Sequence, residues 1–315
     1  MFNGSAFYSA HQTTLAGTVT CSGIGLHTGK PVKLTLHPAD ADTGIQFVRL
    51  DVIEEHSVIP AYYLNVCDTR LGTTIANSHG VTVSTIEHLM AALWGSGIDN
   101  AIVTLDGPEV PIMDGSSEPF VFLIECAGIK TLSSHRDTLE VLKKVSVKQG
   151  DSTASIRPFD GFALNITIEY PGTAIPRQRA LYDFSTQSFK HALCRARTFG
   201  FAADVEKLQA QGLARGGSLD NAIVIGDDAV LNEEGLRYGD EFVRHKALDC
   251  VGDYFLSGLR IRGAVTTTRP GHSINHKLLT ALFSDRSAWR LVTRTHVAPE
   301  FPMQQQAKPP QFATA

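Results

Sequence analysis

The chain has 315 residues, which is long enough for two domains. Hydrophobic residues make up 43% and charged residues 19%, an ordinary balance for a globular protein. The composition excludes a disordered or collagen-like chain. The net charge of −4 provides no large basic field for nucleic acid, and the longest apolar stretches are too short to cross a bilayer, so we expect a soluble protein without stable membrane insertion.

The first half of the chain alternates strand-like segments with two helices. Its strands are predicted, in chain order, over Thr13–Val19, Pro31–Leu36, Gly44–Leu50 and Asn100–Leu105. A small inserted sheet is predicted around Ser57–Val66. Apolar residues at helical spacing predict a helix over Ser84–Trp94, which Gly95 would end, and a second helix over Ser116–Ala127.

The second half follows the same order of elements. Its strands are predicted, in chain order, over Leu139–Val147, Thr153–Ile156, Phe162–Tyr170 and Ile261–Thr268. Helices are predicted over about Glu241–Leu256 and Asn275–Phe283. A short sequence similarity links the halves, because Leu36–Asp40 (LHPAD) and Ile156–Asp160 (IRPFD) end equivalent strands. The matching order predicts an internal duplication, with two unrelated strands that end in similar turns as the alternative.

Two interruptions set the expected domain limits. The polar stretch Leu132–Asp137 (LSSHRD) predicts a linker, which gives a first domain over residues 1–133 and a second over residues 138–296. Residues Asp204–Asn232 hold a short helix, a Gly-rich turn and a strand that interrupt the repeat, and such insertions often carry specificity. The tail over residues 297–315 is rich in Pro, Gln and Ala and is predicted to be disordered.

The cysteines and the N-terminus indicate the cellular compartment. The five cysteines lie far apart and form no C-x-x-C pair, which argues against a disulfide framework or a cysteine-built zinc site. The first residues (MFNGSAFYSAHQTT) lack the basic and apolar regions of a signal peptide. These features predict reduced thiols in a cytoplasmic protein.

The predicted helix from Glu241 carries a pair of side chains suited to a metal. His245 and Asp249 are neighbours one turn apart, so an imidazole nitrogen and a carboxylate oxygen can reach one zinc ion. Lys246 and Asp253 lie in the same sector of the helix. The alternative is that these residues form the solvated face of an amphipathic helix.

A second polar pair opens the helix predicted from Ser84. Glu87 and His88 lie off its apolar stripe, where the histidine can hold a metal while the adjacent carboxylate takes a proton from water. Ser84 and Glu87 also fit a capping box, in which Glu87 would bond back to the backbone of Ser84. The residues alone leave both interpretations open.

Three further residues are candidates for acid, orienting and oxyanion roles. His272 follows a glycine after a predicted strand and is a candidate acid, or else a histidine on a surface loop. Asp253 is placed to orient a histidine. Thr198 is a candidate hydroxyl donor to an oxyanion, or an ordinary strand residue. The glycines of Gly23–Gly29 lack the spacing of a dinucleotide-binding loop and predict a hairpin turn.

Several short motifs occur in a recognisable order. They are Gly25–Gly29 (GLHTG), Ser84–Leu89 (STIEHL), Gly97–Ala101 (GIDNA), Pro111–Ser116 (PIMDGS), Arg195–Phe201 (RARTFGF), Gly216–Ser218 (GGS), Phe242–Lys246 (FVRHK) with Asp249, and Gly271–His272. These motifs and their order, over about residues 12–295, resemble those of the bacterial UDP-3-O-acyl-N-acetylglucosamine deacetylases of lipid A biosynthesis.

The resemblance implies a fold and a reaction. The fold would be α+β, with two similar domains from an internal duplication, helices packed between two sheets, and a small insertion in each domain. The reaction would be zinc-dependent hydrolysis of the 2-acetamido group of UDP-3-O-(3-hydroxyacyl)-N-acetylglucosamine, with release of acetate. The expected partner is this acylated UDP-sugar, an amphiphilic small molecule, bound by a cytoplasmic monomer.

The resemblance also implies roles for individual residues. The implied ligands of Zn²⁺ are His88, His245 and Asp249, and Fe²⁺ can occupy the same set. The implied catalytic residues are Glu87 as general base, His272 as acid or electrostatic stabiliser, Asp253 as its partner and Thr198 as oxyanion donor. The implied substrate contacts are Lys246, Phe199 and His27. The insertion over Asp204–Asn232 would form an apolar passage for the acyl chain.

Two positions depart from the family pattern. Thr268-Arg269-Pro270 stands where a Tyr-Lys-Ser run is common, and His276 stands where an Asn is common, so the nucleotide contacts near these residues are open. Two other functions are compatible with the residues: a zinc amidohydrolase acting on another sugar amide, and a non-catalytic nucleotide-sugar binder. Metal content and the dependence of turnover on the acyl chain distinguish them from the deacetylase.

Overall fold

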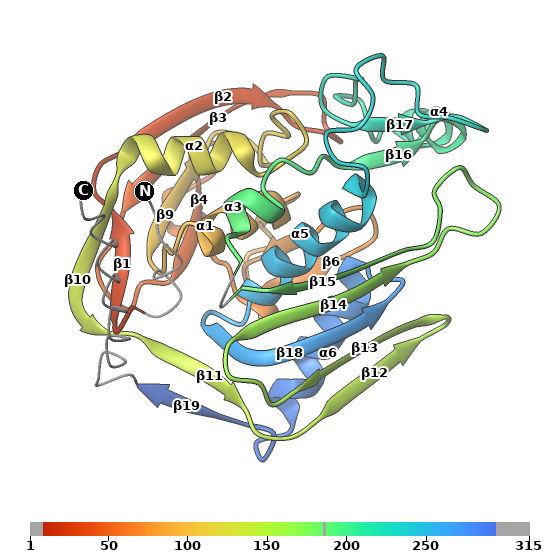
Figure 1. Ribbon diagram of the computed structural model, residues 1–315. Helices are drawn as coiled ribbons and strands as arrows, with labels where there is room; N and C mark the ends of the chain where they lie inside the picture. Colours follow the sequence, from red (N-terminus) through yellow and green to blue (C-terminus); the bar gives the residue numbers. More distant parts are fainter. Residues whose placement is uncertain (1–8, 185–186, 294–315) are drawn as a thin grey trace, which may run out of the picture.

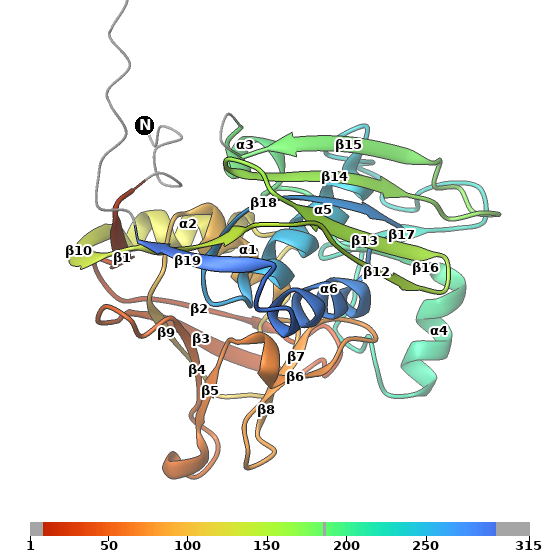
Figure 2. The same cartoon turned by 90° about the horizontal axis from the view of Figure 1, so that it is seen from below.

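The computed structural model describes residues 9–184 and 187–293, and the sheet of its first half forms one layer of the molecule (Figures 1 and 2). The strands, in sheet order, are β2 (Val19–Ile24), β3 (Pro31–Pro38), β9 (Ala101–Leu105), β4 (Ile45–Arg49) and β5 (Val58–Pro60). β9 is antiparallel to β3 and parallel to β4. Alternate residues of β4 and β9 are buried, because one face of the sheet packs on the core.

The sheet of the second half repeats this topology. Its strands, in pairing order, are β12 (Val145–Gln149), β13 (Ser152–Arg157), β18 (Arg260–Thr268), β14 (Phe162–Ile168) and β15 (Gln178–Asp183). β18 is antiparallel to β13 and parallel to β14, just as β9 is to β3 and β4. This shared strand order confirms the predicted α+β fold with two similar halves.

Each half also has an antiparallel strand pair. β1 (His11–Leu15) pairs with β10 (Ile129–His135), and β11 (Asp137–Val141) pairs with β19 (Trp289–Thr293). β11 also pairs with β18, which joins this second pair to the larger sheet. Residues 132–137, predicted as a polar linker, therefore lie almost wholly in β10 and β11. The domain limits at 133 and 138 stay a prediction.

The long helices lie between the two sheets (Figure 2). They are α1 (Glu87–Gly95), α2 (Glu118–Ala127), α5 (Glu241–Phe255) and α6 (His272–Ser284). Residues 87–94 of α1 are all buried, which explains why this helix is apolar on almost every side. A Cβ at Gly252 of α5 would lie 2.1 Å from the backbone oxygen of Glu87, so this glycine allows α5 to lie directly against the first turn of α1.

Each half carries an insertion. The first consists of a small sheet of β6 (Val66–Asp68), β7 (Thr74–Ala76) and β8 (Thr82–Val83). It begins later than the predicted Ser57–Val66, because β5 pairs with β4 in the main sheet. The second consists of the parallel pair β16 (Phe199–Phe201) and β17 (Ile223–Ile225) with α4 (Ala202–Ala210), after the short α3 (Phe189–Ala192). The structure thus has the helix and the strand predicted within Asp204–Asn232.

Some element limits differ from those predicted. The single strand over Leu139–Val147 is two strands, because the chain turns at residues 142–144 (LKK), which contain none of the residues that usually mark turns. The strand over Thr13–Val19 is divided between β1 and β2, and the helix predicted from Asn275 begins at His272. The predicted disordered tail at 297–315 lies outside the described residues. Within those residues, no helix combines the length and apolar character needed to cross a membrane.

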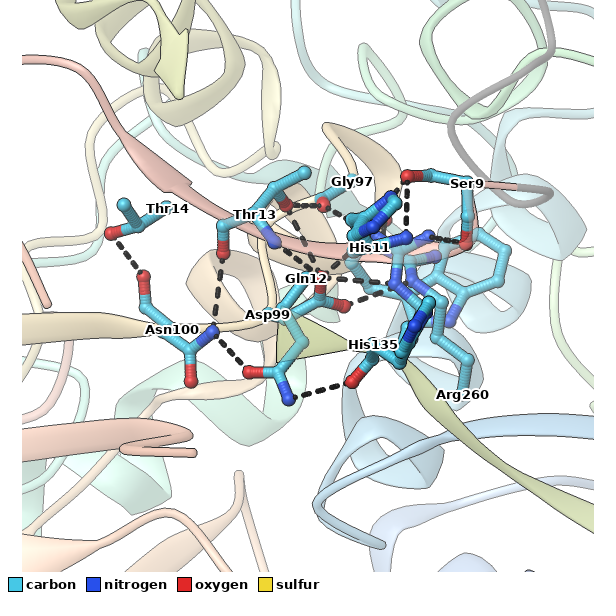
Figure 3. A network of polar contacts seen from close by, with 12 residues as sticks. Ser9, His11, Gln12, Thr13, Thr14, Gly97, Asp99, Asn100, His135 and Arg260 are labelled. Atoms are coloured by element: carbon cyan, nitrogen blue, oxygen red, sulfur yellow. Dashed lines mark hydrogen bonds and ion pairs between the residues drawn. The ribbon is translucent and has the colours of Figure 1, made fainter. Parts of the chain in front are cut away.

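A polar network around Asp99 ties the two halves together (Figure 3). The Asp99 carboxylate accepts hydrogen bonds from Arg136 at 2.6 Å and from the backbone N–H of Thr13 at 2.8 Å. It also pairs with Arg260 at 3.4 Å. Asp99 directly precedes Asn100 and β9 in the first half, whereas Arg260 opens β18 in the second. The ion pairs therefore fix the central strands of the two sheets relative to each other.

Candidate metal centre and active site

Three metal-ligating side chains converge where α1 meets α5. They are His88, His245 and Asp249, which we call the metal cluster, and their ligand atoms all lie within 4.8 Å of one another. Asp249 Oδ1 lies 3.6 Å from His88 Nε2 and 3.3 Å from His245 Nε2. Donors about 2.0–2.1 Å from a tetrahedral zinc ion are roughly 3.3 Å apart, so the spacing fits one ion.

One oxygen of the Asp249 carboxylate has no hydrogen-bond partner among the described residues. Oδ2 accepts a hydrogen bond from Lys246 Nζ at 2.9 Å, whereas Oδ1 is buried and has no hydrogen-bond partner among the described residues. Burial opposes the charged carboxylate, but attraction to the protonated form of His245 and to the Lys246 ammonium outweighs it and holds the pKa of Asp249 well below its ordinary range. An ionised, buried oxygen is costly unless something binds it, so the cluster suits a cation.

The ring of His245 is set up as a ligand. Its Nδ1 lies 3.1 Å from the backbone oxygen of Ala196, which can only accept, so Nδ1 carries the hydrogen and Nε2 keeps a lone pair. Burial lowers the pKa of His245 to about 3, which favours the same neutral form. His245 and Asp249 are also buried, so the interpretation of this helix face as solvated is wrong.

Glu87 lines the same cavity as His88, His245 and Asp249, and it does not cap its helix. Ile86 occupies the N-cap position of α1, and no side chain forms a capping hydrogen bond there. Glu87 Oε2 accepts the backbone N–H of Thr73 at 2.9 Å, and Oε1 lies 3.7 Å from His272 Nε2. The capping-box interpretation is therefore wrong, and one carboxylate oxygen points toward His272.

The chain just before α1 is held in a strained conformation. Thr85 has a φ of 58°, in the left-handed region that β-branched residues rarely adopt. Its hydroxyl donates to Glu109 Oε1 at 3.1 Å, and Glu109 also accepts the backbone N–H groups of His27 and Thr28 at 2.8 and 2.9 Å. Such strain persists where surrounding contacts impose it, and here those contacts fix the start of α1.

His272 lies between the carboxylates of Asp253 and Glu87. It is the first residue of α6 and its side chain is only 11% exposed, so the surface-loop interpretation is wrong. Nδ1 lies 2.9 Å from Asp253 Oδ2, which leaves Nε2 toward Glu87. Burial opposes protonation, but the carboxylates of Asp253 and Glu87 outweigh it and raise the pKa of His272 to about 10. The ring is therefore an imidazolium at neutral pH in the metal-free protein.

A cavity of about 400 Å³ collects most of the predicted site residues. Those in its lining are Glu87, His88, Thr198, Phe199, His245, Lys246, Asp249 and His272. Asp253 lies behind His272, while His27, Arg269 and His276 are not part of the lining. Both ring nitrogens of His27 are buried and lack hydrogen-bond partners among the described residues. The structure thus brings together the metal, base and acid candidates but leaves His27 outside this cavity.

Part of the cavity wall was not predicted from the sequence. Thr69, Arg70 and Leu71 line it from the first insertion, and Leu26 lines it from the turn after β2. No spacing rule places these residues near α5, because the insertion reaches the cavity only through the tertiary fold. Leu26 stands within the GLHTG motif, and that motif was the one available signal for this part of the wall.

An aromatic cluster borders the metal cluster. The Phe199 ring packs edge-on against Phe242 at 5.1 Å and His245 at 6.1 Å between ring centres, and Tyr170 contacts Phe199 at 5.8 Å. Lys246 Nζ lies 5.3 Å from the centre of the Phe199 ring. The cavity lining therefore has an aromatic side chain, Phe199 of β16, next to the charged Lys246 and Asp249.

Comparison with known proteins finds a matching family and a similar curated protein. The sequence profile of the family described as UDP-3-O-acyl N-acetylglycosamine deacetylase (LpxC) matches residues 12–284. A curated protein of Sodalis glossinidius (strain morsitans), named UDP-3-O-acyl-N-acetylglucosamine deacetylase, is 50% identical over 284 residues. These residues make up 90% of this chain and 93% of that relative.

Proposed function

The chain belongs to the UDP-3-O-acyl N-acetylglycosamine deacetylase family, and we propose that His88, His245 and Asp249 hold its catalytic metal. Family membership makes it an amide-deacetylating hydrolase of lipid A biosynthesis whose substrate is an acylated UDP-sugar. The observation that supports the metal assignment best is Asp249 Oδ1. It is a buried oxygen without a hydrogen-bond partner among the described residues, and it lies beside the Nε2 atoms of two histidines.

Zinc fits this donor set best. Two imidazole nitrogens and one carboxylate oxygen leave a coordination position free, as in catalytic zinc sites, and Fe²⁺ accepts the same donors. The bound metal would supply Lewis-acid chemistry, which lowers the pKa of water and polarises the acetamide carbonyl.

The residues around the metal cluster divide the proton transfers of amide hydrolysis. Glu87 takes a proton from water as the water oxygen bonds to the acetamide carbon. His272, held by Asp253, gives a proton to the amine nitrogen as the carbon–nitrogen bond breaks. The Thr198 hydroxyl donates a hydrogen bond to the carbonyl oxygen as that oxygen gains negative charge. The products are acetate and the free 2-amino sugar nucleotide.

The remaining cavity wall would bind the rest of UDP-3-O-(3-hydroxyacyl)-N-acetylglucosamine. Lys246 and Phe199 lie beside the metal cluster and would contact the sugar nucleotide, and His27 is a further predicted contact. The stretch Asp204–Asn232 begins within α4, just after β16, and would form the apolar passage for the acyl chain. We also propose a cytoplasmic monomer with domains over residues 1–133 and 138–296.

Metal analysis combined with an acetate assay tests this proposal. The substrates are synthetic UDP-N-acetylglucosamine derivatives with 3-O-acyl chains of several lengths and the unacylated parent. We expect one metal per chain, acetate release that a chelator removes and zinc restores, and strong preference for an acylated substrate. An intact His88→Ala protein with full activity would contradict the ligand assignment.

The same assay distinguishes the two alternatives. Equal cleavage of acylated and unacylated substrates would favour an amidohydrolase acting on another sugar amide. A folded protein that binds the sugar nucleotide but holds no metal and releases no acetate would favour a binding protein.

A further inference from the structure

Thr73 contacts both carboxylates that flank His272. Its backbone N–H donates to Glu87 Oε2 at 2.9 Å, and its hydroxyl donates to Asp253 Oδ1 at 2.6 Å. It lies in the first insertion, directly before β7, whereas Asp253 lies on α5, 180 residues away in sequence. Thr73 therefore connects the candidate base to the partner of the candidate acid.

The position of Thr73 is itself tightly fixed. The residue is 2% exposed, and its backbone oxygen accepts the N–H of Ile86 at 3.3 Å. A Cβ on Gly72 would lie 2.9 Å from Glu87 Oε1, so the turn before β7 runs directly against this carboxylate. All three polar groups of Thr73 are thus engaged, two with the start of α1 and one with α5.

The hydrogen bond from the Thr73 hydroxyl constrains the orientation of the Asp253 carboxylate. Asp253 Oδ2 lies 2.9 Å from His272 Nδ1 and accepts a hydrogen bond from Asn275 Nδ2 at 2.8 Å. Oδ1 is held by Thr73, so both oxygens have fixed partners and Oδ2 stays aimed at the imidazole. Without the hydroxyl, Oδ1 loses this partner and the carboxylate gains freedom to rotate, which loosens the His272 ring.

We infer that Thr73 is a positioning residue of the hydrolytic reaction, because it holds Asp253 and Glu87 so that His272 Nε2 faces Glu87 Oε1. The inference rests on the proposed function, since it concerns the step in which Glu87 and His272 move protons. Thr73 is neither a member of the metal cluster nor a lining residue of the main cavity, so its effect passes through its two carboxylate partners, Glu87 and Asp253.

Thr73→Val in the metal-loaded enzyme tests this role. Valine keeps the shape of the side chain and the backbone N–H to Glu87 but removes the hydroxyl. We expect kcat to fall about 10- to 100-fold, as for other partners that orient catalytic side chains, while KM and metal content stay unchanged. Thr73→Ser keeps the hydroxyl and should recover most of the loss.

Thr14→Val is the matched control. Thr14 is equally buried at 2%, and its hydroxyl donates to the backbone oxygen of Asn100 at 2.8 Å, outside the cavity lining. Loss of this hydroxyl should lower the thermal unfolding temperature without changing kcat. A fall in kcat after Thr73→Val alone would then reflect positioning and not a general loss of stability.

A double variant shows the route of the effect. If Thr73 acts through Asp253 and His272, Thr73→Val should cause little further loss in a His272→Ala background. The inference is overturned by a wild-type kcat in Thr73→Val, by a serine variant as slow as the valine one, or by full independent losses in the double variant. Failure of the wild-type enzyme to release acetate would instead contradict the proposed function.

Discussion

Asp99 and Asp249 are both acidic residues enclosed between the two halves, and their surroundings differ. The Asp99 carboxylate accepts hydrogen bonds from Arg136 and the Thr13 backbone and pairs with Arg260 (Figure 3). Asp249 has Lys246 on one oxygen and no hydrogen-bond partner on the other among the described residues. The first carboxylate is balanced by two guanidinium groups, and the second keeps an ionised oxygen for something outside the chain.

This difference separates a carboxylate that fixes the structure from one that binds a ligand. A buried charge surrounded by its partners determines how the segments carrying them are placed, and removal of one partner is costly. A buried charge with an unpaired oxygen lowers stability unless a ligand compensates. Burial alone does not distinguish the two cases, whereas the number of partners on each oxygen does.

The largest effect is expected from Asp249→Asn, which tests the ligand side of the comparison. Loss of the anionic ligand should abolish metal binding and reduce acetate release at least about 1,000-fold, because the metal contributes several kcal/mol to the transition state. In the metal-free state the variant loses both the unpaired carboxylate charge and the ion pair with Lys246, so its stability should differ little from that of the metal-free wild type. Metal analysis, the acetate assay and thermal unfolding measure this. Full metal occupancy in the variant would refute the comparison.

Glu87→Gln should reduce kcat by about 100- to 10,000-fold, the range for a general base. The amide keeps the shape of the side chain and can still accept the N–H of Thr73, so the fold and the metal content should be unchanged. Parallel metal analysis and steady-state kinetics check the result. A variant that loses its metal would show that Glu87 supports the metal cluster and does not act as the base.

Asp99→Asn should affect stability and leave catalysis unchanged. It removes the Asp99 charge from Arg136 and Arg260, and loss of one partner of an ion pair costs about 3–5 kcal/mol when the pair is buried and less for the partly exposed Asp99. Urea unfolding measures this loss, and kcat of the folded enzyme should equal that of the wild type. A matching fall in kcat would show that the Asp99 network also serves the active site.

The last expected effect is a pH dependence of the metal-free protein. The folded-state pKa of His272 is raised to about 10, above the unfolded value of about 6.5. Its protonation therefore stabilises the fold fully below pH 6.5, and this contribution is lost as pH rises toward 10, by at most about 1.4 kcal/mol per pH unit. Unfolding at several pH values, compared with His272→Gln, measures it. Identical pH profiles of the two proteins would contradict the raised pKa.

The sequence predicted the local parts of this site and could not predict how they meet. Helical periodicity predicted that His245 and Asp249 lie one turn apart on one helix. The matching order of predicted elements in the two halves predicted the repeated strand order. The pairing of His88 with that helix came from resemblance alone, because no local pattern shows which helices pack together. Thr73 carried no signal, since its partner Asp253 lies 180 residues away.

The error at the start of α1 has a plain physical cause. Ser84 and Glu87 match a capping box, so local chemistry supports that interpretation. Tertiary contacts decide otherwise, because the backbone N–H of Thr73 binds the Glu87 carboxylate. The local rule fails here because a polar side chain finds its partner on another segment.

The assembly of the metal cluster from two helices of different halves has a consequence for the timing of synthesis. His88 leaves the ribosome long before His245 and Asp249, and the loop between α1 and α5 must close before all three donors can meet. The nascent first half therefore offers one imidazole and a carboxylate beside it, a set too small for tight zinc capture. If the metal cluster holds the metal as proposed, metal acquisition would accordingly be a late event that follows the docking of the second half.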